Sequence, residues 1–180
     1  DAGKGVVGGE AGVYIGYKAG YGVSAETTSG GNNTALGYEA LKVFTTGDYS
    51  TAIGSNAGGS ISSGVYNTIV GALAGDAITT GNRNTLMGVG TGGSFDTESE
   101  NTAVGFEALS NGGYAADDST VMGYRAGKEL TTASGSTFFG HTAGGEITTG
   151  NQNIAIGLNA MNGGTTTGDN NIAMGVSAGD

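Results

Sequence analysis

Residues 67–75 read NTIVGALAG, and this pattern decides the fold because it returns along almost the whole chain. It consists of Asn or Ser, Thr, two apolar residues, Gly, two variable residues and Ala. Further copies are NTALGYEAL from Asn33, STAIGSNAG from Ser50, NTLMGVGTG from Asn84, NTAVGFEAL from Asn101, STVMGYRAG from Ser119, STFFGHTAG from Ser136, NIAIGLNAM from Asn153, NIAMGVSAG from Asn171 and the variant VYIGYKAG from Val13.

The central glycines of the copies keep a nearly constant spacing, which chance does not maintain over so long a stretch. After a first interval of 21 residues they recur every 17 or 18 residues. A looser spacer motif, TTG, stands between copies, as at residues 45–47. The period is too short for repeats built from helical hairpins, and short apolar runs bounded by Gly and Asn are typical of strands and turns. The sequence therefore predicts an all-β fold, a parallel β-solenoid of about ten coils in which each coil satisfies the backbone of its neighbours.

Residues 13–180 are predicted to form a single solenoid domain. Residues 1–12 are irregular, and we interpret them as an N-terminal cap or a partial coil, since GVVGGEAG from Gly5 resembles the motif but is out of phase. Because the chain opens at Asp1 without Met, we expect a piece or a processed form of a longer protein.

The composition narrows the classes of partner. There are 39 Gly but no Pro, which excludes a collagen triple helix. The net charge of −10 disfavours nucleic acid and anionic membrane surfaces as partners. The chain has no Cys and hence no disulfides, and no stretch approaches 18 apolar residues, so we expect no membrane insertion.

Alternation along each strand assigns the residues to two faces. We call the residues at one motif position in successive copies a rank. The rank just before the central Gly is always apolar, and we predict that it fills the coil core: Ile15, Leu36, Ile53, Val70, Met87, Val104, Met122, Phe139, Ile156 and Met174. The Thr rank lies two residues earlier and is therefore predicted to point to the same face. The Ala rank after the two variable residues is predicted to point inward at a corner.

The rank between these two must then face outward, yet it is also apolar. It contains Ala35, Ala52, Ile69, Leu86, Ala103, Val121, Phe138, Ala155 and Ala173. A strand that is apolar on both faces is buried on both faces, so we predict that this rank is an oligomer interface. The alternative is a flattened monomer whose own loops cover the rank. The Asn residues that open most copies are predicted to form structural ladders along the axis.

The motif resembles the head-domain repeats of trimeric autotransporter adhesins of the YadA type and, with its TTG spacers, the repeats of bacteriophage tail fibres and tail spikes. The resemblance covers residues 13–180, although adhesin coils are shorter. It implies a left-handed parallel β-roll, a homotrimer with apolar faces on the threefold axis, and a location outside the cell, on a cell surface or on a virion. A weaker resemblance links Gly-x-x-Ala to hexapeptide-repeat proteins.

Three functions compete on this basis. The first is a non-catalytic structural and adhesive segment of an extracellular fibre, whose partners are copies of itself and a host receptor or glycan. Its predicted contact surface contains Tyr17, Tyr38, Phe106, Tyr124 and His141. The second is ice binding through regular Thr ranks, although parity places the best Thr rank inside. The third is a hexapeptide-repeat acyltransferase that uses the single His141 as a base.

We expect no cofactor. Carboxylates are scattered over the loops and are densest at residues 96–100 and 117–118, so calcium binding is the alternative to plain solvation. The remaining loop carboxylates of this kind are Asp48, Asp76, Glu129 and Asp169.

Overall fold

The computed structural model describes residues 1–4, 11–22, 29–111, 116–164 and 167–180. These ranges contain ten strands of three residues each. They are β1 (Val13–Ile15), β2 (Thr34–Leu36), β3 (Thr51–Ile53), β4 (Thr68–Val70), β5 (Thr85–Met87), β6 (Thr102–Val104), β7 (Thr120–Met122), β8 (Thr137–Phe139), β9 (Ile154–Ile156) and β10 (Ile172–Met174).

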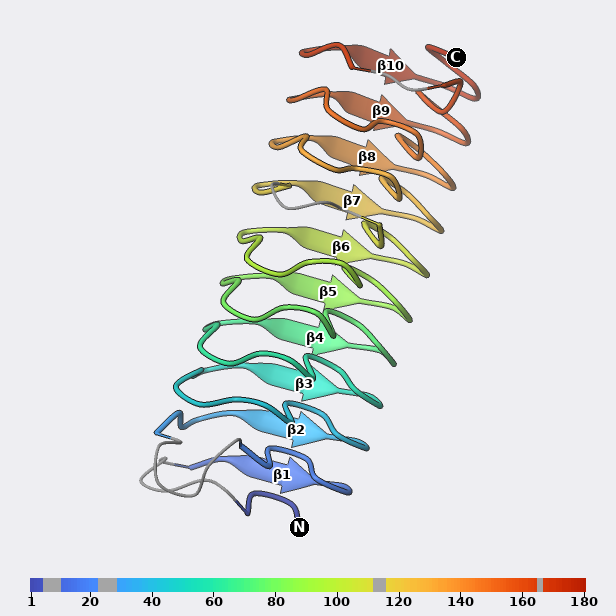
Figure 1. Cartoon of the computed structure of the whole chain (residues 1–180). Coiled ribbons are helices and arrows are strands. Elements are labelled where there is room, and N and C mark those ends of the chain that lie inside the picture. The colour runs from blue at the N-terminus through green and yellow to red at the C-terminus, as the bar shows by residue number, and fades with distance from the viewer. Residues whose placement is uncertain (5–10, 23–28, 112–115, 165–166) are drawn as a thin grey trace.

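The strands form one parallel sheet in chain order, with each strand in register with the next, as in the pairing of Thr34 with Thr51 and of Thr51 with Thr68. Figure 1 shows the strands stacked one above another in chain order, from β1 to β10. We number the coils after their strands. The predicted all-β parallel solenoid is thereby confirmed.

The central glycine ends each strand because only glycine fits there. Its φ lies between +128° and +147° in all ten copies, a region that residues with a side chain rarely adopt. A Cβ placed on Gly105 would also overlap the carbonyl oxygen of Gly123 in the next coil. The backbone of one coil therefore lies directly against that of the next at this turn.

The Asn rank joins successive coils through side chains. The backbone N–H of Asn84 donates to Oδ1 of Asn67 over 2.9 Å, while Nδ2 of Asn84 donates to the carbonyl of Glu98 over 2.7 Å. Oδ1 of Asn84 in turn accepts from the N–H of Asn101 at 3.1 Å. These side chains are buried, which confirms the structural role predicted for the Asn rank.

A second ladder runs two residues before the Asn rank, and the sequence analysis did not anticipate it. The N–H of Val65 donates to Oδ1 of Asn82 at 2.9 Å, and the N–H of Asn82 donates to Oγ of Ser99 at 3.0 Å. The N–H of Ser99 donates to Oδ1 of Asp117 at 2.7 Å. Each of these bonds goes from one coil to the side chain of the following coil, so the two ladders run in opposite directions.

The two strand faces are the reverse of the prediction. The rank assigned to the oligomer interface lies inside the coils, with exposed fractions of 0–7%. This buried set comprises Ala35, Ala52, Ile69, Leu86, Ala103, Val121, Phe138, Ala155 and Ala173. The rank assigned to the core lies on the outside, partly or fully exposed. It comprises Ile15, Leu36, Ile53, Val70, Met87, Val104, Met122, Phe139, Ile156 and Met174.

The physical reason lies in the Thr rank, which lies on the same face of the strands as the apolar rank. Seven threonine hydroxyls inside an apolar core would each have needed a hydrogen-bond partner; on the outside, water supplies it. The core is closed instead by the corner Ala rank, whose predicted inward orientation is confirmed. It is also closed, in coils 2–5, 7 and 8, by an apolar residue just before the spacer, which the sequence analysis overlooked. These residues are Phe44, Ile61, Ile78, Phe95, Leu130 and Ile147.

The narrow core balances large residues against small ones. Phe138 and Leu86 are each followed six residues later by glycine, Gly144 and Gly92, where an added Cβ would press on the larger side chain. Ala103 is followed at the same distance by Leu109, which is fully buried. In these three coils a large residue at one of the two positions is thus matched by a small one at the other, as close packing requires.

The predicted cap at residues 1–12 falls partly outside the described residues, since 5–10 are not described. Of the rest, Gly3 donates its N–H to the carbonyl of Ala19 at 2.9 Å.

Replacing Gly105 by Ala tests the contact between coils. Both Gly105 and Gly164 have φ near +130° to +140°, but no atom of the residues that the structure describes lies within 4 Å of a Cβ on Gly164. We expect Gly164→Ala to lower the free energy of unfolding by about 1–3 kcal/mol, the cost of a strained backbone conformation. We expect Gly105→Ala to lower it by at least about 2 kcal/mol more, because the added Cβ also forces the two coils apart. Denaturant unfolding followed by circular dichroism measures both losses; equal losses would contradict the contact.

Candidate functional site: the exposed sheet face

Three ranks run along the rod, two on the outside of the strands and one in the turn just after them, and we call them together the exposed sheet face. The Thr rank comprises Thr34, Thr51, Thr68, Thr85, Thr102, Thr120 and Thr137, and its place is taken by Val13, Ile154 and Ile172 in the remaining coils. The apolar rank is the Ile15-to-Met174 rank described above. The rank after the central glycine comprises Tyr17, Tyr38, Ser55, Ala72, Val89, Phe106, Tyr124, His141, Leu158 and Val176.

The exposed sheet face carries no carboxylate, ammonium or guanidinium group. The chain has 16 acidic and six basic residues, and none of them falls in these three ranks. Large apolar side chains nevertheless stand in solvent here, with Leu36 43%, Met122 42% and Phe139 54% exposed. The net charge of −10 is therefore carried entirely by the rest of the surface.

The face is comparable in size with the largest apolar patch of a typical soluble monomer. Ten strands at about 4.8 Å spacing extend for about 43 Å, and five residues across cover at most about 16 Å, which gives at most roughly 700 Å². The largest apolar patch on a typical soluble monomer is about 300–600 Å² and is often functional. Threonines make up one edge, so the apolar part is somewhat smaller than the whole.

The predicted contact residues are exposed in one rank, where the structure groups them into two stacks. Tyr17 and Tyr38 stack with centroids 5.3 Å apart, and Tyr124 stacks on Phe106 at 5.4 Å and on His141 at 4.8 Å. Because rings of successive coils lie against one another, their flat faces are largely covered and their edges point outward. Such rings stabilise the stacking of coils and offer edges rather than platforms to a partner.

His141 shows no catalytic arrangement among its contacts. Its ring stacks on Tyr124, and Nδ1 lies 3.4 Å from the hydroxyl of Thr142, whose oxygen also bonds to the side chain of Asn159.

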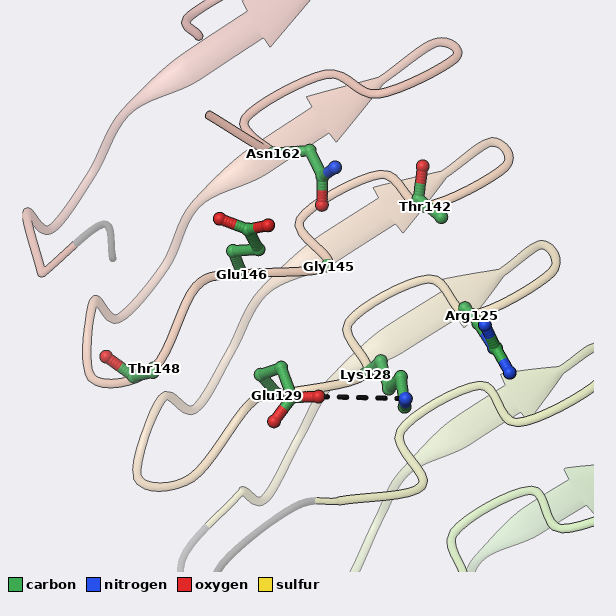
Figure 2. Close-up of a pocket in the computed structure, with 8 residues that line it drawn as sticks. All are labelled: Arg125, Lys128, Glu129, Thr142, Gly145, Glu146, Thr148 and Asn162. Atoms are coloured by element: carbon green, nitrogen blue, oxygen red, sulfur yellow. Dashed lines mark ion pairs between the residues drawn. The ribbon is translucent and has the colours of Figure 1, made fainter. Parts of the chain in front are cut away.

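A cleft of about 490 Å³ lies on another side of the rod, in the loops that follow β7, β8 and β9 (Figure 2). It is lined by Arg125, Lys128, Glu129, Thr142, Gly145, Glu146, Thr148 and Asn162. Nε of Arg125 lies 2.7 Å from Glu107, and Nζ of Lys128 lies 3.8 Å from Glu129. Both cations are thus already paired with carboxylates, which makes the cleft a weak site for an anionic ligand.

The acidic segments predicted as a candidate calcium site are used within the fold. Asp96 bonds to the hydroxyl of Thr79, Glu98 is buried, and Asp117 accepts from the backbone of Ser99. Glu100 pairs with Arg83, over 2.8 Å from Nε. Among the residues that the structure describes, no group of three or more His, Cys, Asp or Glu side chains is placed to hold a metal ion.

Glu100 and Asp118 influence each other's protonation. The hydrogen bond from Arg83 lowers the pKa of Glu100 below its usual value, while the hydrogen bond shared with Glu100 raises the pKa of Asp118. The pair therefore keeps a proton on Asp118 to higher pH than an isolated aspartate would.

Comparisons with known proteins identify no relative: no family model, no curated protein and no solved structure matches this chain. Within the described ranges there is also no helix long and apolar enough to cross a membrane.

Substituting Glu100 by Gln tests the coupling of the two carboxyls. We expect the pKa of Asp118 to fall, because the neutral amide no longer repels the ionised Asp118 carboxylate and its NH₂ group can donate a hydrogen bond to it. Because the raised pKa of Asp118 favours folding most at low pH, this contribution fades in the wild type as pH rises through that pKa. Carbon NMR titration of the Asp118 carboxyl measures the shift, and an unchanged pKa would refute the coupling.

Proposed function

We propose that this chain is a non-catalytic structural and adhesive segment of an extracellular fibre, on a cell surface or a virion, which associates with copies of itself through the exposed sheet face. The observation that carries the proposal is the uncharged, apolar face that continues along all ten coils. The interface is the apolar rank with its two flanking ranks, in place of the buried rank that sequence parity indicated.

The size of the face supports association between copies of the chain. Two such faces laid together bury at most about 1,400 Å² in total, and specific protein interfaces typically bury about 1,200–2,000 Å². The remaining surface has a net charge of −10, so repulsion opposes contact through the other sides. On an uncharged face, copies can meet without desolvating like charges.

The assembly that the motif's resemblance implies is a homotrimer with these faces turned to a threefold axis. Parallel, in-register strands repeat the same contact at every coil, so each added coil adds to the affinity. A host receptor or glycan would then contact the surfaces that remain outside, including the cleft loops of Figure 2.

Two charges placed in the centre of the face test this proposal. The double variant Val104→Lys, Met122→Lys is expected to weaken association by at least about a hundredfold, because each unpaired charge buried in an interface costs several kcal/mol. The matched control is Thr80→Lys, Thr97→Lys, which adds the same charge at two exposed positions outside the face.

Sedimentation velocity at micromolar concentration measures the outcome. The wild type and the control should sediment as one defined oligomer and the face variant as a monomer, with identical circular dichroism. A monomeric wild type, or a face variant that stays oligomeric, would sink the proposal.

Ice binding is the second candidate. Alternation along the strands had placed the Thr rank inside the coils, whereas the structure places it outside. Seven threonines stand on the outside in one straight rank, spaced by one coil each. Regular hydroxyl and methyl groups on a rigid face are what an ordered water layer would require.

Thermal hysteresis of the purified protein decides between the two candidates. If the Thr rank binds ice, the wild type shows hysteresis, and Thr85→Lys, Thr102→Lys abolishes it while Thr80→Lys, Thr97→Lys does not. We expect no hysteresis in any of the three proteins, in keeping with the fibre proposal.

A further inference from the structure

The methionines of this chain are concentrated on one surface. The sequence has four of them, and Met87, Met122 and Met174 all belong to the apolar rank of the exposed sheet face. Their exposed fractions are 43%, 42% and 66%, whereas Met161 is 4% exposed. The flexible thioether of methionine adapts well to an uneven protein partner, but it is also the apolar side chain that oxidants modify most easily.

Two of these methionines lie near the middle of the rod. Met87 ends β5 and Met122 ends β7, so they stand on either side of Val104 at the end of β6. Because they are two coils apart, their backbones are separated by about 10 Å. A second copy seated over the middle of the face therefore covers both sulfur atoms.

The fold does not depend on either side chain. The N–H of Gly105 donates to the carbonyl of Met87 over 2.8 Å, a bond of the backbone alone. In the same way, the N–H of Gly140 donates to the carbonyl of Met122 over 2.9 Å. The interior of the coil is filled by the inward rank, such as the fully buried Leu86. A chemical change at either sulfur therefore alters the outer face and leaves the coil intact.

An exposed thioether reacts with hydrogen peroxide without any further reactant. A lone pair of the sulfur attacks one peroxide oxygen, so that an S–O bond forms while the O–O bond breaks. The departing oxygen takes up the proton of the transferred one and leaves as water. The sulfur is oxidised by two electrons, the peroxide is reduced by two, and methionine sulfoxide reductases can reverse the change.

The sulfoxide changes what the middle of the face can bind. It replaces an apolar group by a polar one whose oxygen accepts hydrogen bonds. On a free chain, water satisfies that oxygen. A second copy would have to displace this water beside the apolar side chains of Val70, Val104 and Phe139, and leaving a buried acceptor unpaired is unfavourable.

We propose that Met87 and Met122 form a modification site, at which oxidation of the free chain by a hydroperoxide prevents association through the exposed sheet face. This inference rests on the proposed function, because the face must associate before oxidation can prevent it. Copies that have already associated cover both thioethers and protect them. The oxidation therefore acts on chains before they assemble.

Three proteins test the site. They are the wild type, Met87→Leu with Met122→Leu, and Met87→Gln with Met122→Gln. Leucine keeps the volume and the apolar character, as Leu36 does in the same rank, but peroxide does not oxidise it. Glutamine introduces a polar acceptor of similar length without any oxidation. Each protein is treated with hydrogen peroxide at nanomolar concentration, before it is concentrated to micromolar for sedimentation velocity.

Peptide mass mapping follows the oxidation itself. In the treated wild type, Met87 and Met122 should each gain about 16 Da, the mass of one oxygen, at least about tenfold faster than the buried Met161. Comparable rates at the exposed methionines and at Met161 would overturn the proposal.

Sedimentation follows the consequence. The treated wild type and the untreated Gln variant should associate at least about tenfold more weakly than the untreated wild type, with unchanged circular dichroism. Methionine sulfoxide reductases of both stereospecificities should restore association of the treated wild type. The Leu variant retains Met161 and Met174, and it should associate equally well before and after peroxide.

The outcomes separate this inference from the proposed function. A monomeric untreated wild type would remove both. A wild type that associates equally with and without the two sulfoxides would overturn the inference alone and leave the proposed function standing. Dissociation of the peroxide-treated Leu variant would do the same, because a residue other than Met87 and Met122 would then be responsible.

Discussion

Hydrogen bonding from each coil to the next is the constraint on which the rest of this structure depends. It brings successive backbones to about 4.8 Å, and at the turn after each strand this spacing leaves no room for a Cβ between Gly105 and Gly123. The glycine rank therefore fixes the phase of the repeat. Once the phase is fixed, the residues at each remaining motif position line up in a straight rank. A residue type that recurs at one position therefore forms a continuous stripe along the rod.

The same constraint means that folding does not require the outer face to be apolar. The interior of a coil is narrow and is filled by balanced pairs, such as Phe138 with Gly144 and Ala103 with Leu109. Met122 and Phe139 have no place in it and stand 42% and 54% exposed. The core is complete without the apolar rank, and for this reason we propose that a partner covers that rank.

The sequence predicted what depends on spacing and missed what depends on side-chain direction. The 17–18-residue period was sufficient to predict the parallel solenoid, the turn glycines and the inward Ala corner. Alternation separated the two strand faces but could not say which was inner, because both central ranks are apolar. Two signals in the sequence could have decided the question. They are the Thr hydroxyls, which need a hydrogen-bond partner, and the apolar residue, such as Ile78, that precedes most of the spacers.

The shape of the exposed sheet face also bears on which partner it suits. Along the apolar rank the side chains change from Val70 to Met87 and from Met122 to Phe139, so the surface is uneven on the scale of single methyl groups. An ordered water lattice requires equal heights at equal spacing, and only the Thr rank offers that. Protein side chains can interdigitate with uneven ones and gain contact area by doing so. The most apolar rank of the face is itself uneven in height, and this combination favours another protein chain over ice.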